Sequence, residues 1–93
     1  MVDKKSPVPL YIQLRDTLRE AVGAGEYPAG SQLPTEFELA RRYGLGRATV
    51  RSALDLLLRD GVIEKRHGVG TFVRRPRREF SFEPLISLTS FLR

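Results

Sequence analysis

The sequence predicts a small, mainly α-helical domain in which three helices are followed by a β-hairpin. Three observations predict it: apolar residues recur at helical spacing in three successive segments, glycine-containing turns separate these segments, and two β-rich runs follow around the sequence HGVG. Of the 93 residues, 41% are hydrophobic, which is enough for one compact core but not for two. We therefore expect one folded domain over residues 9–74, with residues 1–8 before it and residues 75–93 after it.

The first helix is expected to begin at Pro9, because proline is favoured at the start of a helix. Its apolar residues fall along one side: Leu10, Leu14, Leu18, Ala21 and Val22. Gly23 and Gly25 are expected to end this helix, which is interpreted as scaffold. The polar residues 1–8 are interpreted as a flexible arm that is either disordered or in contact with phosphate through its lysines.

A turn and a short extended stretch come next. Pro28 fixes its own φ, and Gly25 and Gly30 permit positive φ. Residues Ser31 to Leu33 are then expected to run extended and to pair with a later strand.

The second helix is expected to begin at about Glu36. Thr35, followed three residues later by Glu38, fits a capping box in which each residue satisfies a free amide of the other. Three apolar residues are expected to face inward: Leu39, Ala40 and Tyr43. Gly44 should close the helix in the left-handed conformation, which leaves a turn of about three residues before the next helix.

The third helix is predicted within GRATVRSALDLLLRD, residues 46–60. Its core stripe has the i, i+3, i+4, i+7 spacing: Val50, Ala53, Leu54 and Leu57. Arg47, Arg51 and Ser52 fall away from this stripe. Leu56 and Leu58 also lie off it, and we favour burial in the core over burial against a partner for both.

Gly61 is expected to end the third helix, and VIEKR and TFVRR to pair around HGVG as a hairpin. Val62 and Ile63 should anchor the first strand, and Phe72 should return to the core from the second. Two short helices joined by a glycine-containing turn, followed by a hairpin with a basic tip, describe a winged helix-turn-helix.

The net charge of +5 is concentrated in one part of the chain. Residues 47–78 hold nine Lys or Arg against three Asp or Glu, whereas residues 1–46 balance. Such a local basic field attracts polyanions, either nucleic acid or an acidic membrane. Arg47 and Arg51, one turn apart near a helix start, suit a DNA major groove, although a solvated basic face has the same composition.

Other classes of function find little support in the sequence. The chain has no cysteine and a single histidine, so neither a thiolate metal site nor a cofactor site is expected. No constellation of Ser, His and Asp and no carboxylate pair points to an enzyme. Neither a membrane span nor a signal peptide is expected. The absence of cysteine fits an intracellular setting.

Residues 8–73 resemble the DNA-binding domain of the GntR family of bacterial transcription regulators. The most specific segments are LPTEFELA, RATVRSALDLLLRDGVIE and GVGTFV, and the last of these, with YIQLRDTL, is similar to the HutC-like branch. The resemblance implies a cytoplasmic regulator, normally a repressor, that binds double-stranded operator DNA as a homodimer. A winged-helix module that binds proteins instead of specific DNA is the alternative.

The resemblance also implies which residues meet DNA in the third helix. Arg47 and Arg51 match the family's operator-contacting arginines, and one of them is expected to reach a guanine edge. Thr49 and Ser52 are expected at phosphate oxygens or simply exposed, and Ala48 is small enough to lie against a thymine methyl.

Further contacts are expected from the second helix and the hairpin. The start of the second helix contributes Thr35, Glu36 and Phe37 to the expected interface. Phe37 is a departure, because the family often has Arg there; it either takes part without that charge or packs. The hairpin contributes four residues: Lys65 and Arg66 as phosphate neutralisers or solvated edge residues, and His67 and Gly68 at the minor groove or in a plain exposed turn.

Residues 75–93 are interpreted as a basic linker followed by the truncated start of an effector-binding domain. In the family such a domain senses a small molecule, so any effector is expected to act only through a region that is missing here.

Overall fold

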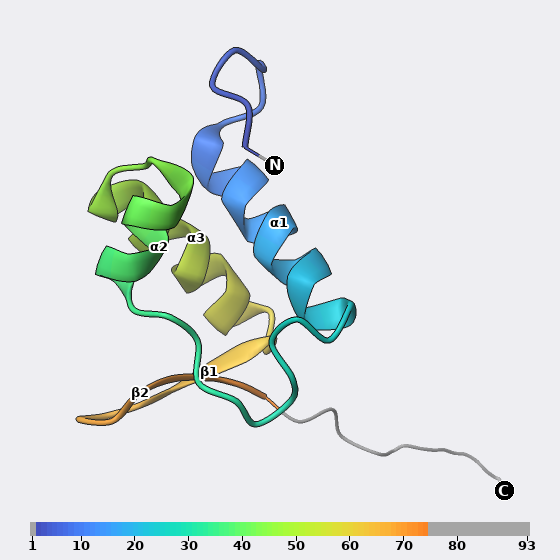
Figure 1. The fold of residues 1–93 in the computed structure, drawn as a ribbon, viewed down its shortest axis with the longest axis vertical. Coiled ribbons are helices and arrows are strands. Elements are labelled where there is room, and N and C mark those ends of the chain that lie inside the picture. Colours follow the sequence, from blue (N-terminus) through green and yellow to red (C-terminus); the bar gives the residue numbers. More distant parts are fainter. Residues whose placement is uncertain (1, 75–93) are drawn as a thin grey trace, which may run out of the picture.

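The computed structural model describes residues 2–74, which form three helices and a two-stranded antiparallel hairpin (Figure 1). The helices are α1 (Leu10–Gly23), α2 (Glu36–Tyr43) and α3 (Arg47–Arg59), and the strands are β1 (Ile63–Arg66) and β2 (Gly70–Val73). The predicted fold class is therefore confirmed. The interpretation of residues 75–93 as a linker and a second domain lies outside the described residues.

The helices pack around a single core. α1 and α3 lie side by side and make the largest helix contact, and α2 packs on α3 (Figure 1). The largest fully buried side chains come from all three helices and from β1: Leu14, Leu18, Leu39, Val50, Leu57 and Ile63. The predicted core stripes of the three helices are thus confirmed, and Leu58 and Tyr43 pack against this core as partly buried residues. Leu56 is half-buried.

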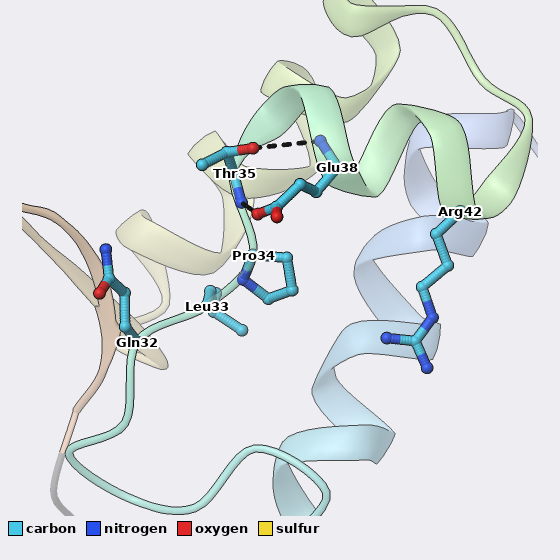
Figure 2. Close-up of a pocket in the computed structure, with 6 residues that line it drawn as sticks. All are labelled: Gln32, Leu33, Pro34, Thr35, Glu38 and Arg42. Atoms are coloured by element: carbon cyan, nitrogen blue, oxygen red, sulfur yellow. Dashed lines mark hydrogen bonds between the residues drawn. The ribbon is translucent and has the colours of Figure 1, made fainter.

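The ends of α2 follow the predicted local chemistry. The hydroxyl of Thr35 accepts a hydrogen bond from the amide of Glu38 at 3.1 Å, and the Glu38 carboxylate accepts one from the amide of Thr35 at 2.8 Å (Figure 2). Gly44 then adopts φ +66°, a left-handed backbone conformation that residues other than glycine rarely adopt. Only Gly44 to Gly46 then separate the end of α2 from the start of α3, so the two helices form a helix-turn-helix with a three-residue turn.

The hairpin is joined by a third extended segment, as predicted. Ile63 pairs with Val73 and Arg66 with Gly70 across the hairpin. Gln32 forms an isolated bridge to Phe72 on the outer side of β2. The amide of Leu33 donates to the carbonyl of Thr71 at 2.8 Å. The hairpin is therefore tied to the segment that leads into α2.

One prediction for the hairpin is wrong. Phe72 does not return to the core; Val73 does, with 2% of its surface exposed. Because Val73 pairs directly with the buried Ile63, alternation along the strand places Phe72 on the opposite face. There the ring is half-buried, with the Arg66 guanidinium 4.2 Å from its centroid.

Residues 2–8, interpreted above as a flexible arm, turn back onto α1 in the structure. The side chain of Gln13 accepts a hydrogen bond from the amide of Asp3 at 2.6 Å and donates to the carbonyls of Asp3 and Val8 at 2.9 and 2.7 Å. Val2 packs against the core. Within residues 2–74, no helix has the length and apolar character needed to cross a membrane.

Candidate nucleic-acid interface

Arg47 and Arg51 lie in the first two turns of α3, and their side chains are 61% and 59% exposed. Both reach the same carboxylate, that of Glu36 at the start of α2. Arg51 donates to its two oxygens from Nε at 3.2 Å and from Nη2 at 3.1 Å, and the Nη2 of Arg47 lies 3.6 Å from Oε1. This bidentate geometry fixes the plane of the Arg51 guanidinium. Glu36 therefore gathers the two predicted DNA-contacting arginines into one cluster.

The electrostatics of this cluster follow from its composition. The hydrogen bond from Arg51 is the main reason why the pKa of Glu36 lies below its ordinary value; the charges of Arg51 and Arg47 act in the same direction, and burial opposes them. The same hydrogen bond raises the pKa of Arg51. Both shifts favour the charged forms of Glu36 and Arg51. Two guanidinium groups against one carboxylate give the cluster a net positive charge.

The remaining predicted residues of α3 line its surface beside α1. Ala48 and Ser52 are exposed, and Thr49 is half-buried. Together with Leu10 and Tyr11 of α1, these three residues line a shallow hollow of about 360 Å³. Gly46 at the helix start offers no side-chain cap, and no acidic residue occupies the first turn of α3. The first turn of α3 therefore brings no negative charge of its own against an anion, and the carboxylate beside it, that of Glu36, comes from α2.

The start of α2 presents Thr35 and Phe37 to solvent. The Thr35 hydroxyl is engaged in the helix cap, so its role in the structure is already to begin α2. Phe37 is 54% exposed and is not part of the buried core. The guanidinium carbon of Arg41, one turn later, lies 5.8 Å from the centroid of its ring.

The hairpin tip places His67 and Gly68 in solvent, with Lys65 exposed before them. Arg66 is engaged within the hairpin: besides stacking on Phe72, its Nε donates to the Glu64 carboxylate at 3.0 Å. The tip turn is closed by a hydrogen bond from the amide of Val69 to the carbonyl of Arg66 at 3.0 Å.

One hollow connects the helices to the hairpin. Its volume is about 300 Å³, and Glu36, Arg51, Asp55, Lys65 and Val69 are among its lining residues. The structure therefore brings the start of α2, the exposed side of α3 and the hairpin to one surface. His67 and Gly68 do not line this hollow; they lie beyond it at the hairpin tip.

Gln32 is the structural residue that sequence reasoning missed. Its side chain donates from Nε2 to the carbonyl of Val69 at 3.2 Å and so holds the hairpin tip. The contact joins residues 37 positions apart, and no local pattern in the sequence signals it. Gln32 also lines a second, open hollow of about 510 Å³ with Leu33, Pro34, Thr35, Glu38 and Arg42 (Figure 2).

Comparison with known protein families identifies the family of this chain. Residues 10–73 match the family model described as bacterial regulatory proteins, gntR family. The chain belongs to the gntR family of bacterial regulatory proteins. The match covers all three helices and both strands, so the predicted resemblance is confirmed.

Relatives of this gntR-family chain are transcription regulators, not enzymes. It is 38% identical over 88 residues to the transcriptional repressor NagR of Bacillus subtilis, covering 95% of this chain and 36% of NagR. The chain spans about a third of the length of this relative and of two other curated relatives.

Solved structures share the fold of this gntR-family chain. YtrA of Sulfolobus acidocaldarius, a GntR-family transcription factor, matches 83% of this chain and 81% of its own at 30% identity, with a TM-score of 0.77. The DNA-binding domain of AraR in complex with its operator ORX1 matches 78% of this chain and 94% of its own at 29% identity, with a TM-score of 0.72.

Proposed function

We propose that this chain binds a specific double-stranded DNA operator and thereby regulates transcription, normally as a repressor. The observation that carries the proposal is the cluster of Arg47 and Arg51 around Glu36, on the surface that α3 shares with the hairpin. The likeness to NagR, a repressor, and to the AraR domain crystallised with operator DNA supports it.

In this proposal the N-terminal half of α3 enters the major groove. Arg47 and Arg51 present planar donors that match the O6 and N7 acceptors of guanine, and Ala48 is small enough to let the helix approach a thymine methyl. Thr49 and Ser52 donate their hydroxyls to phosphate oxygens. Because these groups lie on the solvent side of a helix whose opposite side is buried, the core fixes their direction.

Glu36 prepares the arginines for this contact. It holds the Arg51 guanidinium in one plane before DNA arrives, so less side-chain freedom is lost on binding. Thr35 and Phe37 flank it at the start of α2. A lone carboxylate beside phosphates would oppose binding, but here it is outnumbered by the two guanidinium groups.

The hairpin is proposed as the wing that approaches the minor groove, with His67 and Gly68 at its tip. Lys65 neutralises phosphates from its exposed position. Arg66 combines two roles: its stacking on Phe72 stiffens the wing, and its side chain, still 53% exposed, presents charge to the backbone.

We further propose that the regulator acts in the bacterial cytoplasm as a homodimer on an inverted-repeat operator. Two copies related by a two-fold axis present two α3 helices to two half-sites, which accounts for the symmetry of such an operator. We propose that a small-molecule effector acts through a separate effector-binding domain and not through residues 2–74. No cofactor is needed for the binding surface, because its contacts are made by side chains.

Selection of bound sequences from a random duplex pool, followed by affinity measurements at two salt concentrations, tests the proposal. Arg47→Ala should reduce the preference for the selected operator over random DNA by about 10- to 100-fold, because a bidentate contact to a base is lost. Lys65→Ala should weaken binding to both DNAs alike and lower the slope of log affinity against log salt by about one. Equal losses on both DNAs for both variants would contradict this division between α3 and the wing.

A further inference from the structure

Phe37 is an aromatic side chain that the fold leaves in solvent at the first turn of α2. It is 54% exposed, and Arg41 lies with its guanidinium carbon 5.8 Å from the ring centroid. Within residues 2–74, only Val8, Tyr11 and Val69 are large apolar residues with comparable exposure. A phenyl ring in this position adds little to the core, so the packing of the domain does not account for it.

The position of Phe37 relates it to the charged cluster. Glu36, the residue immediately before it, reaches both Arg47 and Arg51. Adjacent residues on a helix project roughly 100° apart, so the ring stands beside this bridge and not within it. Phe37 thus borders the proposed DNA-binding surface, with Arg41 on its other side.

We propose that Phe37 contacts the 5-methyl group of a thymine in the major groove, a proposal that rests on the function proposed above. The major-groove edges of the base pairs offer hydrogen-bonding atoms and a single apolar group, the thymine methyl. An apolar ring beside the Arg41 guanidinium gains nothing from phosphates, but it gains from burying that methyl. Arg41, against the ring, neutralises a phosphate of the same strand.

The charge around Phe37 favours DNA over a second copy of the chain as the partner that covers this ring. A two-fold contact centred on the ring would bring Arg41, Arg47 and Arg51 of one copy, which outnumber the neighbouring carboxylates of Glu36 and Glu38, towards the same residues of the other. Such like charges repel, whereas a polyanion is attracted to all three. The surroundings of the ring therefore fit DNA.

Deoxyuridine tests the proposal, because it differs from thymidine only by the missing methyl. The operator selected from the random pool is synthesised with each thymine in turn replaced by deoxyuridine, and binding of the wild-type chain and of Phe37→Ala is measured. In each half-site, one replacement should weaken wild-type binding by about fourfold, the value of one buried methyl group. Phe37→Ala should bind thymidine and deoxyuridine equally at that position.

Two further variants complete the experiment. Phe37→Leu, which keeps an apolar side chain, should retain part of the preference for thymidine. Val8→Ala, which removes another exposed apolar side chain, in the segment before α1 and away from the charged cluster, should retain all of it. Circular dichroism of each variant checks that it is folded.

The proposal is overturned if, at every thymine position, replacement by deoxyuridine weakens the binding of Phe37→Ala as much as that of the wild type. It is also overturned if Phe37→Ala changes self-association without DNA while leaving every methyl effect intact, since the ring would then contact another copy. Failure of the proposed function looks different: no sequence is enriched from the pool, and Arg47→Ala has no effect on binding.

Discussion

Glu36 carries one negative charge between two guanidinium groups, and this single residue couples the start of α2 to the start of α3. Its side chain is 28% exposed, which leaves it open to water and to titration. The hydrogen bond from Arg51 stabilises the ionised carboxylate and therefore lowers its pKa. A carboxylate that would repel DNA if it stood alone thus supports the arrangement of the two arginines that we propose contact DNA.

The lowered pKa of Glu36 predicts a pH dependence of stability. Since the pKa in the folded state lies below the ordinary value of 4.5, the stabilisation from the ionised carboxylate is fully present above that value. It is lost as the pH falls through the lowered pKa. Urea unfolding of the wild type and Glu36→Gln from about pH 7 to about pH 3 should give a difference in free energy that is constant at first and then shrinks in acid. A difference that does not change with pH would show that the bridge is absent in solution.

At the scale of whole elements, the sequence predicts what depends on neighbouring residues. The Thr35 and Glu38 capping box and the left-handed Gly44 involve contacts within a few positions, and both were predictable. The burial of Val73 in place of Phe72 was not predictable. Side chains alternate between the two faces of a strand, and the sequence does not show which face is buried until the pairing register is known. The predicted residues of α3 lie on its exposed side, but the bridge from Glu36 to Arg51 spans 15 positions and depends on how α2 packs on α3.

The wing depends on Gly70 for its geometry. Gly70 has φ +147°, a conformation that is rare for residues with a side chain, and an added Cβ would collide with the amide of Gln32. Gly70→Ala should therefore lower the free energy of unfolding by about 1–3 kcal/mol. Because the flexible Gln32 side chain can move aside, Gln32→Ala combined with Gly70→Ala should recover only a small part of this loss.

Gly23→Ala serves as the matched control for this prediction. Gly23 is the last residue of α1, and a Cβ there would meet no atom within 4 Å. The unfolding free energy of the Gly23→Ala variant should stay within about 0.5 kcal/mol of the wild-type value in a urea titration. Equal stability of Gly70→Ala and Gly23→Ala would show that the wing does not require the backbone conformation of Gly70.

The whole molecule separates its scaffold from the proposed DNA-binding surface. α1 supplies Leu14 and Leu18 to the core and packs on the buried side of α3, whereas the charged cluster occupies the exposed side. α3 contributes to both, because its buried side belongs to the core and its exposed side carries Arg47 and Arg51. Stability and DNA affinity should therefore respond to different substitutions, even though both depend on this one helix.

Leu18→Ala and Arg51→Ala test this separation at the level of the folded domain. Leu18 is completely buried, so truncation should cost about 2–5 kcal/mol of unfolding free energy, a large share of the stability of a small domain. At a temperature where Leu18→Ala is still folded, its operator affinity should match the wild type. Arg51→Ala should change stability by no more than about 0.5 kcal/mol and yet lose operator preference. Thermal unfolding and operator binding, measured on the same samples, check both expectations. If Arg51→Ala unfolds as readily as Leu18→Ala, the arginine cluster belongs to the scaffold, and the surface assigned to DNA would have to lie elsewhere on the domain.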